Sequence, residues 1–530
     1  MRLKNNIFLL LIVMLSISLG LLIGSQAEQL QLPGLTPKNK LSKIHRLMGY
    51  LSESYVDKIN TDSIVDVVIE DILNQLDPHS VYIPQEASQE LAESMQGNFV
   101  GIGVSFFMVG DTVSVVRVLD GGPSKAVGIA PGDRIMLADG DSLFNQNLSS
   151  TDIVSKLKGR PDTPLELAIY RKQNDSVFWV NLKRGAVPLK SIEASYMVNK
   201  DVGYIKINRF SQTTFVEFEK ALQVLKLQGL QTLVIDLRDN PGGYMIPANQ
   251  IADEFLKENT PIVITESNNG KRQETLATQK GRFETGGLYL LVNEQSASAS
   301  EILAGAIQDN DRGWVVGRRT FGKGLVQQQM PLGDGDAVRL TIARYYTPTG
   351  RSIQRPYNED HEAYYAEVRD RFDTGELSDA TKVPHNDSLA FTTPNGRTVY
   401  GGGGIVPDLY VPNNNTQEEE WNSFVLRSYV INHFVFTKLD AHRNSYTFGR
   451  VDQFLEQPLS QPQQWLSKFE EYCKQNGIPF GFKDQEKILT AIKAYIGLQI
   501  FGEGVFNQVL NTDDPFLKKV LNHLRENTES

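Results

Sequence analysis

An alternation of apolar runs with helical patterns between residues 200 and 317 constrains the fold more than any other feature. Four runs, VGYIKI, TLVIDL, LYLLV and WVVG, have the length and aliphatic content of buried strands. Helical patterns at 215–225, 246–255 and 299–308 separate them. Such alternation is typical of βα units built around a parallel sheet. We therefore expect an α/β core.

The segments on either side of this core show other sequence patterns. Two amphipathic helices are expected before LDPHS at 76–80. From residue 97, short runs rich in Val, Ile and Phe, separated by GGP, PGD and ADGD turns, predict a small β-rich unit. LVQQQMPL and AVRLTIARYY, joined by GDGD, predict a hairpin. The chain becomes helical after VPD at 406–408.

These patterns predict a multidomain protein of mixed α+β and α/β class, and a chain of 530 residues has room for three or four domains. We expect an N-terminal targeting segment 1–28, an N-terminal helical region 29–95, a β-rich domain 96–186, an α/β core 187–413 with a polar insertion 355–400, and a helical C-terminal domain 414–530.

The N-terminus has the pattern of an export signal. Arg2 and Lys4 precede an apolar run at 7–23, and small residues such as Ala27 follow it. The run is at the short limit for crossing a bilayer, so a cleaved signal peptide and an uncleaved membrane anchor both stay open. In either case we expect the body of the protein to be exported, in the periplasm or anchored facing the extracytoplasmic side.

Composition excludes several classes of function. The net charge of −10 and a pI near 5.4 argue against a nucleic-acid binder, which normally carries a basic stripe. The single cysteine, Cys473, allows no intrachain disulfide. No HExxH motif occurs, so we expect no metal site and no cofactor.

A run of small residues at 296–300 lies between a predicted strand and the helical pattern 299–308. A serine in such a turn is exposed, near unpaired N–H groups and the positive end of the helix dipole. Ser298 is therefore a candidate nucleophile, with the N–H of Ala299 placed to stabilise an oxyanion. From this segment alone, the alternative that Ser296, Ser298 and Ser300 are merely helix N-caps stays open.

Lys323 is the candidate base. It lies between two glycines in WVVGRRTFGKGLVQQQ, residues 314–329. A lysine accepts a serine proton only when burial lowers its pKa, and Ser–Lys pairs are a known form of this arrangement. On a regular strand Gln327 shares a face with Lys323, so its amide can orient the amine. The spacing also approximates a phosphate-binding loop, but Gly324 stands where that motif needs Ser or Thr.

Taken together, SASASE, GKG and the following glutamine resemble the C-terminal processing peptidases, also called tail-specific proteases. The resemblance runs from LDPHS through TPTGRSIQ (347–354) to GIVPD (404–408). It implies Ser298 as nucleophile, Lys323 as general base and Gln327 as the orienting partner. DLRDNPGGY (236–244) also matches, which implies that an N–H of Gly242 or Gly243 joins Ala299 in the oxyanion hole. Which of the two glycines it is stays open.

The β-rich domain resembles a PDZ domain through NFVGIGVSF and GIAPGDRIMLADGDSL. In such a domain loop N–H groups bind a peptide's terminal carboxylate, and the peptide adds to a strand edge. The resemblance places this loop at Gly101, Ile102, Gly103 and Val104. It also implies a neighbouring pocket for an apolar final side chain, lined by Ile102, Val104 and Phe106.

We therefore expect a serine endopeptidase that cleaves unfolded or flexible-tailed proteins and recognises their apolar C-termini. The alternative is a catalytically inactive PDZ-bearing scaffold or chaperone. Expected partners are protein or peptide substrates and a second copy of the chain, associating through the helical N- and C-terminal regions. We expect no nucleic acid, and membrane contact only through the N-terminal segment. The insertion 355–400 and the helices after 414 depart from the family pattern.

Overall fold

The computed structural model describes residues 41–278, 281–357, 360–441, 443, 449–479 and 484–529. The chain divides into two compact units, Met1–Leu73 and Asn74–Ser530. The first contains α2 (Leu41–Ser54) and most of α3 (Thr61–Asn74). The targeting segment expected at 1–28 lies outside the described residues. Among the described helices, none combines the length and the apolar character that crossing a membrane requires.

A six-stranded sheet forms the centre of the second unit, which confirms the expected α/β core. Its order is β10-β11-β12-β15-β16-β21, and every pair is parallel except β10 with β11. The strands are β10 (Ile192–Met197), β11 (Val202–Ile207), β12 (Thr232–Asp236), β15 (Gly287–Val292), β16 (Trp314–Gly317) and β21 (Leu409–Tyr410). The carboxyl ends of β12, β15 and β16 therefore meet at one edge, where open α/β sheets bind ligands.

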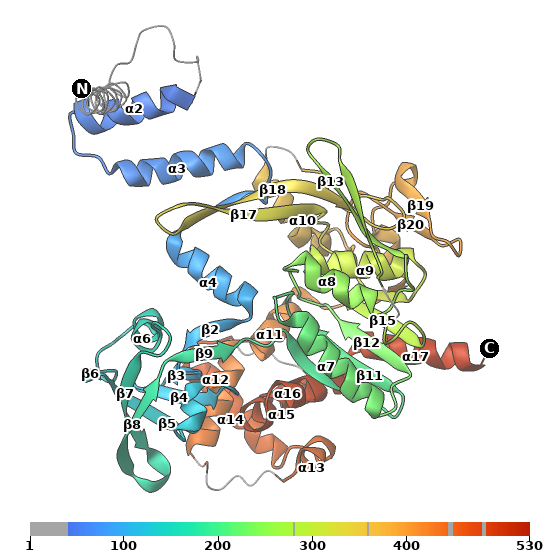
Figure 1. The fold of residues 1–530 in the computed structure, drawn as a ribbon. Coiled ribbons are helices and arrows are strands. Elements are labelled where there is room, and N and C mark those ends of the chain that lie inside the picture. The colour runs from blue at the N-terminus through green and yellow to red at the C-terminus, as the bar shows by residue number, and fades with distance from the viewer. Residues whose placement is uncertain are drawn as a thin grey trace, which may run out of the picture. The chain divides into compact units, whose positions relative to one another are not determined.

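Helices cover both faces of this sheet (Figure 1). The helices α7 (Thr214–Leu227), α8 (Met245–Asp253) and α9 (Ala299–Asp309) share one hydrophobic cluster with Ile235 and Leu290 of the strands. On the opposite face, α17 (Pro515–Glu529) packs through Phe516, Leu517 and Val520. The last helix of the chain thus completes the core rather than standing apart from it.

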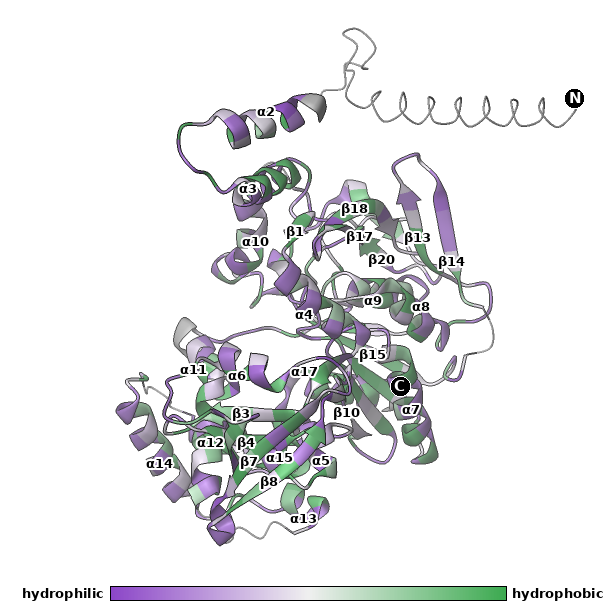
Figure 2. Ribbon diagram, turned by 60° about the vertical axis from the view of Figure 1, so that its left-hand side comes forward, coloured by the Kyte–Doolittle hydropathy of each residue, from purple (hydrophilic) through white to green (hydrophobic). Residues whose placement is uncertain are grey.

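A second sheet carries the predicted hairpin. Its strands are β1 (Val81–Ile83), β13 (Pro261–Ser267), β14 (Arg272–Leu276), β17 (Leu325–Gly333) and β18 (Asp336–Tyr346). β17 and β18 pair antiparallel around the GDGD turn, as expected, and β18 also pairs with β1 and β13. The hairpin of β13 and β14 reaches outward and is largely hydrophilic (Figure 2).

The β-rich domain forms its own sheet and core. The sheet has the order β3-β4-β5-β7-β8, with β6 paired to β5, and a separate ladder joins β2 to β9. Its elements are β2 (Asn98–Gly101), β3 (Val104–Met108), β4 (Val113–Val118), α5 (Pro123–Ala126), β5 (Asp133–Ala138), β6 (Asp141–Ser142), α6 (Ser150–Leu157), β7 (Pro164–Arg171), η1 (Lys172–Asn174), β8 (Ser176–Lys183) and β9 (Gly185–Pro188). Among the described residues β3 has a partner strand on one side only.

The remaining elements are mostly helices. They are α4 (Gln85–Gln96), α10 (His361–Asp373), η2 (Ala380–Lys382), η3 (Asp387–Leu389), the hairpin β19 (Ala390–Thr392) and β20 (Thr398–Tyr400), α11 (Gln417–Arg427), α12 (Tyr429–Ala441), α13 (Val451–Glu456), α14 (Pro462–Gln475), α15 (Gln485–Phe501), α16 (Glu503–Leu510) and η5 (Asn511–Asp513). Residues 360–400 of the insertion therefore contain helices and a β-hairpin.

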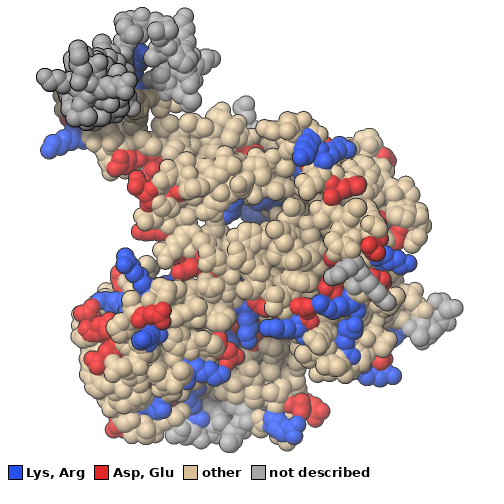
Figure 3. Space-filling view, viewed as in Figure 1, with Lys and Arg blue, Asp and Glu red and all other residues tan. Residues whose placement is uncertain are grey.

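The C-terminal helices pack against the β-rich domain, whose strands lie beside α12 in Figure 1. Phe107 of β3 meets the rings of Tyr429 and Phe436 at centroid distances of 4.7 and 5.6 Å. Arg134 of β5 binds the carboxylate of Asp440 at 2.6 Å, and both side chains are about nine-tenths buried. Acidic and basic side chains are interspersed on the face seen in Figure 3.

Candidate active site

Ser298 lies in the turn between β15 and α9, at the carboxyl edge of the central sheet. Its φ of 56° is in the left-handed region, which a non-glycine residue adopts at a cost and which is common at active sites. Ser296 and Ser300 are fully buried, and their hydroxyls donate to the carbonyls of Leu237 and Asn240. Of the three serines, only Ser298 is partly exposed. The alternative that all three merely cap the helix is therefore not what the structure shows for Ser296 and Ser300.

Asn240 joins the turn after β12 to the turn that carries Ser298. Its side chain is fully buried. Its carbonyl accepts from the Ala297 N–H at 3.0 Å and from the Ser300 hydroxyl at 3.0 Å. Its side-chain Oδ1 accepts from the Gly242 N–H at 2.8 Å. The DNPGG and SASAS segments are therefore held together by one asparagine.

This arrangement separates the two glycines expected in the oxyanion hole. A Cβ on Gly242 would lie 2.9 Å from both the Ser298 Cβ and the Ala299 nitrogen, so glycine is needed there for close approach. The Gly242 N–H, however, is already bound to Asn240. The N–H groups of Gly243 and Ala299 have no acceptor among the described residues. Of the two glycines that the sequence left open, Gly243 is therefore the one whose N–H remains available, together with that of Ala299.

Lys323 contacts Gln327, as the sequence predicts. The Lys323 Nζ donates to the Gln327 Oε1 at 2.6 Å. The amide of Gln327 in turn donates from Nε2 to the carbonyl of His79. The expectation assumed that both residues lie on one regular strand. In the structure β17 begins after Lys323, and its pairing with β18 shifts register between Val326 and Gln327, yet the contact forms. The amide of Gln327 is thus fixed in one orientation, with its oxygen toward the amine.

The loop that presents the His79 carbonyl is held by Asp77, which is 6% exposed. Its carboxylate accepts from the N–H groups of His79 and Ser80 at 2.9 and 3.0 Å. It also accepts from the hydroxyls of Ser80 and Thr341 at 2.6 and 3.1 Å. Thr341 is the β18 partner of Gln327, so the LDPHS loop and the β17–β18 hairpin are fixed to each other.

Glu301 is the residue at this site that sequence reasoning missed. Its fully buried carboxylate accepts from the N–H of Ser298 at 2.8 Å and from the N–H of Lys323 at 2.9 Å. It also accepts from the Gly322 N–H at 2.7 Å and from the Thr320 hydroxyl at 2.5 Å. Burial raises the pKa of this carboxyl, and the hydrogen bonds oppose that rise. Glu301 is the final residue of the SASASE segment, so the motif itself pointed to this glutamate.

Tyr345 of β18 makes a second link between the same two residues. Its hydroxyl lies 2.6 Å from the carbonyl of Lys323 and 3.1 Å from the carbonyl of Ser298, and the two carbonyls share its single proton. The side chain is 1% exposed, and burial raises its pKa well above the usual value, so the hydroxyl remains a donor. The main chains of Ser298 and Lys323 are therefore both bound by Glu301 and both bound by Tyr345.

The electrostatic environment of Lys323 lowers its pKa to about 8. Burial is the main cause, and the nearby Arg339 adds to it, whereas Glu301 and Asp77 act in the opposite direction. His79, the nearest histidine, has its pKa lowered to about 3, again chiefly by burial, and its Nε2 lies 3.0 Å from the Tyr364 hydroxyl. The group at this site that titrates near neutral pH is thus the lysine.

The loop from Gly101 to Val104 lies between β2 and β3. The carbonyls of Ile102 and Gly103 accept from Ser124 and Leu119, each at 2.9 Å. The N–H groups of Ile102 and Gly103 have no acceptor among the described residues. Ile102 itself is 2% exposed and belongs to the domain's core, so its side chain does not line an open pocket as expected. Val104 and Phe106 are half-buried beside that core.

Three family models match the chain. Peptidase family S41 matches residues 201–362, and a PDZ domain matches residues 100–182. A family of unknown function, DUF8443, matches residues 421–502, within the C-terminal helices. The first two matches cover the Ser298 and Lys323 turns and the Gly101–Val104 loop.

Curated relatives agree with these matches. The chain is 32% identical over 320 residues to carboxy-terminal processing protease CtpB of Bacillus subtilis, which covers 59% of this chain and 66% of the relative. It is 32% identical over 323 residues to the carboxy-terminal-processing protease of Bartonella bacilliformis, and the match covers 59% of this chain and 73% of the relative. It is 29% identical over 389 residues to carboxy-terminal processing protease CtpA of Bacillus subtilis, and the match covers 73% of this chain and 80% of the relative. This chain therefore belongs to the carboxy-terminal processing proteases, serine peptidases of family S41 that carry a PDZ domain.

Proposed function

We propose that the protein is an endopeptidase in which Ser298 is the nucleophile, Lys323 the general base and Gln327 the residue that orients the amine. The observation that carries the proposal is the shared binding of the Ser298 and Lys323 main chains by Glu301 and Tyr345. A site fixed in this way needs little reorganisation during reaction, which is the condition for efficient catalysis.

In the proposed acylation step, neutral Lys323 takes the proton of the Ser298 hydroxyl as the oxygen attacks the substrate carbonyl. The N–H groups of Ala299 and Gly243 stabilise the oxyanion that forms. The resulting ammonium then protonates the leaving amine, and an ester on Ser298 remains. Water then attacks that ester while Lys323 accepts its proton. The ammonium returns this proton to the Ser298 oxygen as the ester bond breaks, which restores the hydroxyl and releases the acid.

The lowered pKa of Lys323 supports this assignment, because it increases the neutral fraction of the amine near pH 7. At pH 7 a lysine with a pKa of about 8 is neutral in about one molecule in ten. With the ordinary value of 10.5 it would be neutral in about one molecule in three thousand. Gln327 adds to this by accepting one proton of the amine at 2.6 Å and so aiming the nitrogen.

We propose further that the PDZ domain binds the C-terminus of the substrate. Two features support this: the free N–H groups of Ile102 and Gly103, and the unpaired edge of β3, to which an extended peptide can add. Val104 and Phe106 offer apolar contact to the final side chain. Because a protease cleft takes extended backbone, the substrates are unfolded proteins or flexible tails. Tethering through the tail raises the local concentration of the cleavable segment.

The apolar run at 7–23 supports export of this activity. We place the protein in the periplasm, or anchored to a membrane and facing away from the cytoplasm. Cleavage of an unfolded reporter by cell fractions, compared between the full chain and a chain whose run is interrupted by two aspartates, tests this. Activity in the cytoplasm in both cases would contradict it.

The test of the chemistry uses an unfolded protein with an apolar tail. Ser298→Ala and Lys323→Arg should both abolish cleavage, because a guanidinium stays protonated and cannot accept the serine proton. Arg272→Lys, an exposed change on β14, is the matched control and should leave the rate unchanged. Binding of the substrate without cleavage by the wild-type protein would instead favour a scaffold or chaperone.

A further inference from the structure

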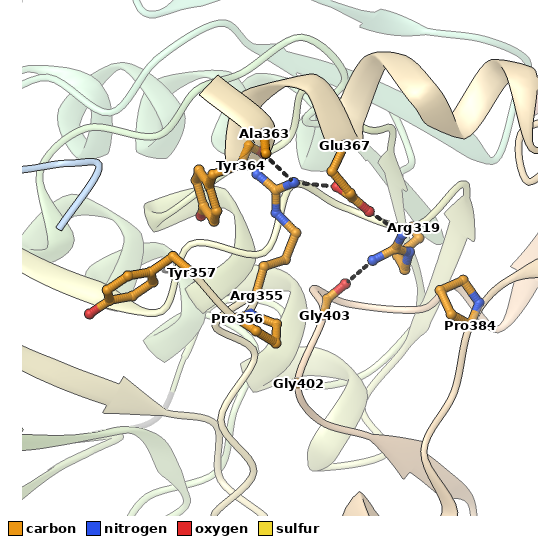
Figure 4. A pocket seen from close by; sticks show the side chains of 10 residues that line it. All are labelled: Arg319, Arg355, Pro356, Tyr357, Ala363, Tyr364, Glu367, Pro384, Gly402 and Gly403. Carbon is orange, nitrogen blue, oxygen red and sulfur yellow. Dashed lines mark hydrogen bonds and ion pairs between the residues drawn. The ribbon is translucent and has the colours of Figure 1, made fainter. Parts of the chain in front are cut away.

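A pocket of about 440 Å³ lies where the insertion meets the core, and no step proposed above uses it. Figure 4 shows the guanidinium of Arg355 between Tyr364 and Glu367, and it shows Arg319 and Gly403 across the pocket from Arg355. The backbone N–H of Arg355 donates to the carbonyl of Gly322 at 3.0 Å. The pocket therefore adjoins the back of the turn that carries Lys323.

The charges around this pocket do not balance. Three guanidinium groups, those of Arg319, Arg355 and Arg371, are paired with only two carboxylates, those of Glu367 and Glu376. Burial disfavours the charged form of Glu367, yet the arginines hold the pKa of this carboxyl at about 2, so it is ionised. One positive charge is left over beside the pocket.

The surplus charge lies on Arg355. Every guanidinium nitrogen of Arg319 donates to a carboxylate or a carbonyl. In Arg355 only Nη1 does so, to Glu367 and to the Tyr364 carbonyl. Its Nε and Nη2 are buried and have no acceptor among the described residues. The side chain is 4% exposed, and an unpaired buried donor of this kind is costly.

The packing of Arg355 fixes this unpaired edge. The guanidinium contacts two aromatic rings, with Cζ 4.3 Å from the centroid of Phe321 and 4.2 Å from that of Tyr364, and the planes of the two rings are inclined at 74°. The N–H bonds of a guanidinium lie in its plane, so Arg355 can form new hydrogen bonds only in that plane. Nε and Nη2 on one edge form the two-pronged donor that fits two oxygens of a carboxylate or a phosphate.

We propose that this pocket binds a small oxyanion, a carboxylate or a phosphate, through the Nε and Nη2 edge of Arg355. Occupancy supplies the missing negative charge and holds α10 of the insertion against the turn at 319–324. The site is independent of the proposed cleavage reaction, since none of its side chains takes part in it.

Calorimetric titration of the full chain at constant ionic strength tests the proposal, with inorganic phosphate in one arm and succinate in the other. We expect saturable binding of at least one. Arg355→Lys keeps the charge but loses the two-pronged edge, and should weaken binding about tenfold or more. Arg272→Lys is the matched control and should bind as the wild type does. Phosphate alone, or succinate alone, identifies the class of ligand.

Hydrogen exchange of the wild-type protein gives a second readout that does not need the variant to fold. Added anion should slow exchange in α10 and in residues 319–324. No binding of either anion, equal binding by Arg355→Lys, or protection confined to other parts of the chain would each overturn the proposal.

Discussion

The turns of the proposed catalytic site and the PDZ loop are held in place by different kinds of interaction. Around Ser298 and Lys323, buried polar side chains such as Glu301, Asp77 and Tyr345 bind the backbone from behind. The loop at 101–104 is shaped by glycines and by backbone bonds, with apolar side chains beneath it. At Gly103, where φ is 78°, a Cβ would lie 2.8 Å from Gly122. The difference predicts that changes at the first site reduce kcat, whereas changes at the second alter substrate choice.

Glu301→Gln is the sharpest way to break this comparison, and it should have the largest effect. The N–H groups of Ser298 and Lys323 both donate to Oε2, and an amide NH2 in that place deprives both of their acceptor. An NH2 in place of Oε1 instead faces the N–H of Gly322 and the hydroxyl of Thr320. We expect kcat to fall about a hundredfold and the free energy of unfolding to drop by about 2 kcal/mol. Glu274→Gln, on an exposed strand, is the control. Unchanged kcat in Glu301→Gln would mean that the hydrogen bonds of Glu301 do not position Ser298 and Lys323.

Gln327→Ala should have the next largest effect. The amine of Lys323 loses the acceptor that aims it, and one hydrogen bond to a charged group corresponds to about a tenfold change in kcat or more. KM should stay the same, because Gln327 touches no proposed substrate contact. Gln329→Ala lies two residues along the same strand, with its amide bound to Ser88, and serves as the control. Equal losses in both variants would point to damage of the strand instead.

Changing the tail of the substrate probes the PDZ side of the comparison. An amidated C-terminus cannot make charge-assisted bonds to the N–H groups of Ile102 and Gly103. We expect KM to rise about tenfold with kcat unchanged. A peptide of the same sequence with a free carboxylate is the control. Identical kinetics for the two peptides would rule out tail recognition and leave the chemistry intact.

Arg134→Gln tests whether the C-terminal helices hold the PDZ domain in place, and its effect should be the smallest on cleavage. The change removes the bidentate partner of Asp440, which is 9% exposed. We expect the free energy of unfolding to fall by about 1–3 kcal/mol, measured by denaturant titration, with kcat nearly unchanged. Arg272→Gln, at an exposed ion pair, should show no measurable change. Equal stability of the two variants would mean that the contact contributes nothing.

The comparison also explains what the sequence could predict. Ser298, Lys323 and Gln327 stand out because their types and spacing are demanded by the chemistry and fall in recognisable turns. Glu301 is visible in SASASE, but three of its four donors come from the turn at 319–324, which only the fold brings beside it. Tyr345 and Asp77 act over even longer separations. The choice between Gly242 and Gly243 depends on one side-chain bond from Asn240, which no pattern encodes.

The most direct measurement of the central claim is the pH dependence of kcat/KM on a peptide without titrating side chains. This profile reports the free enzyme's base. Because burial lowers the pKa of Lys323 to about 8, the rate should rise tenfold per pH unit below that value and level off above it. Gln327→Ala should lower the plateau. A rise centred between pH 6 and 7, as for a histidine base, or a flat profile, would contradict the assignment of Lys323.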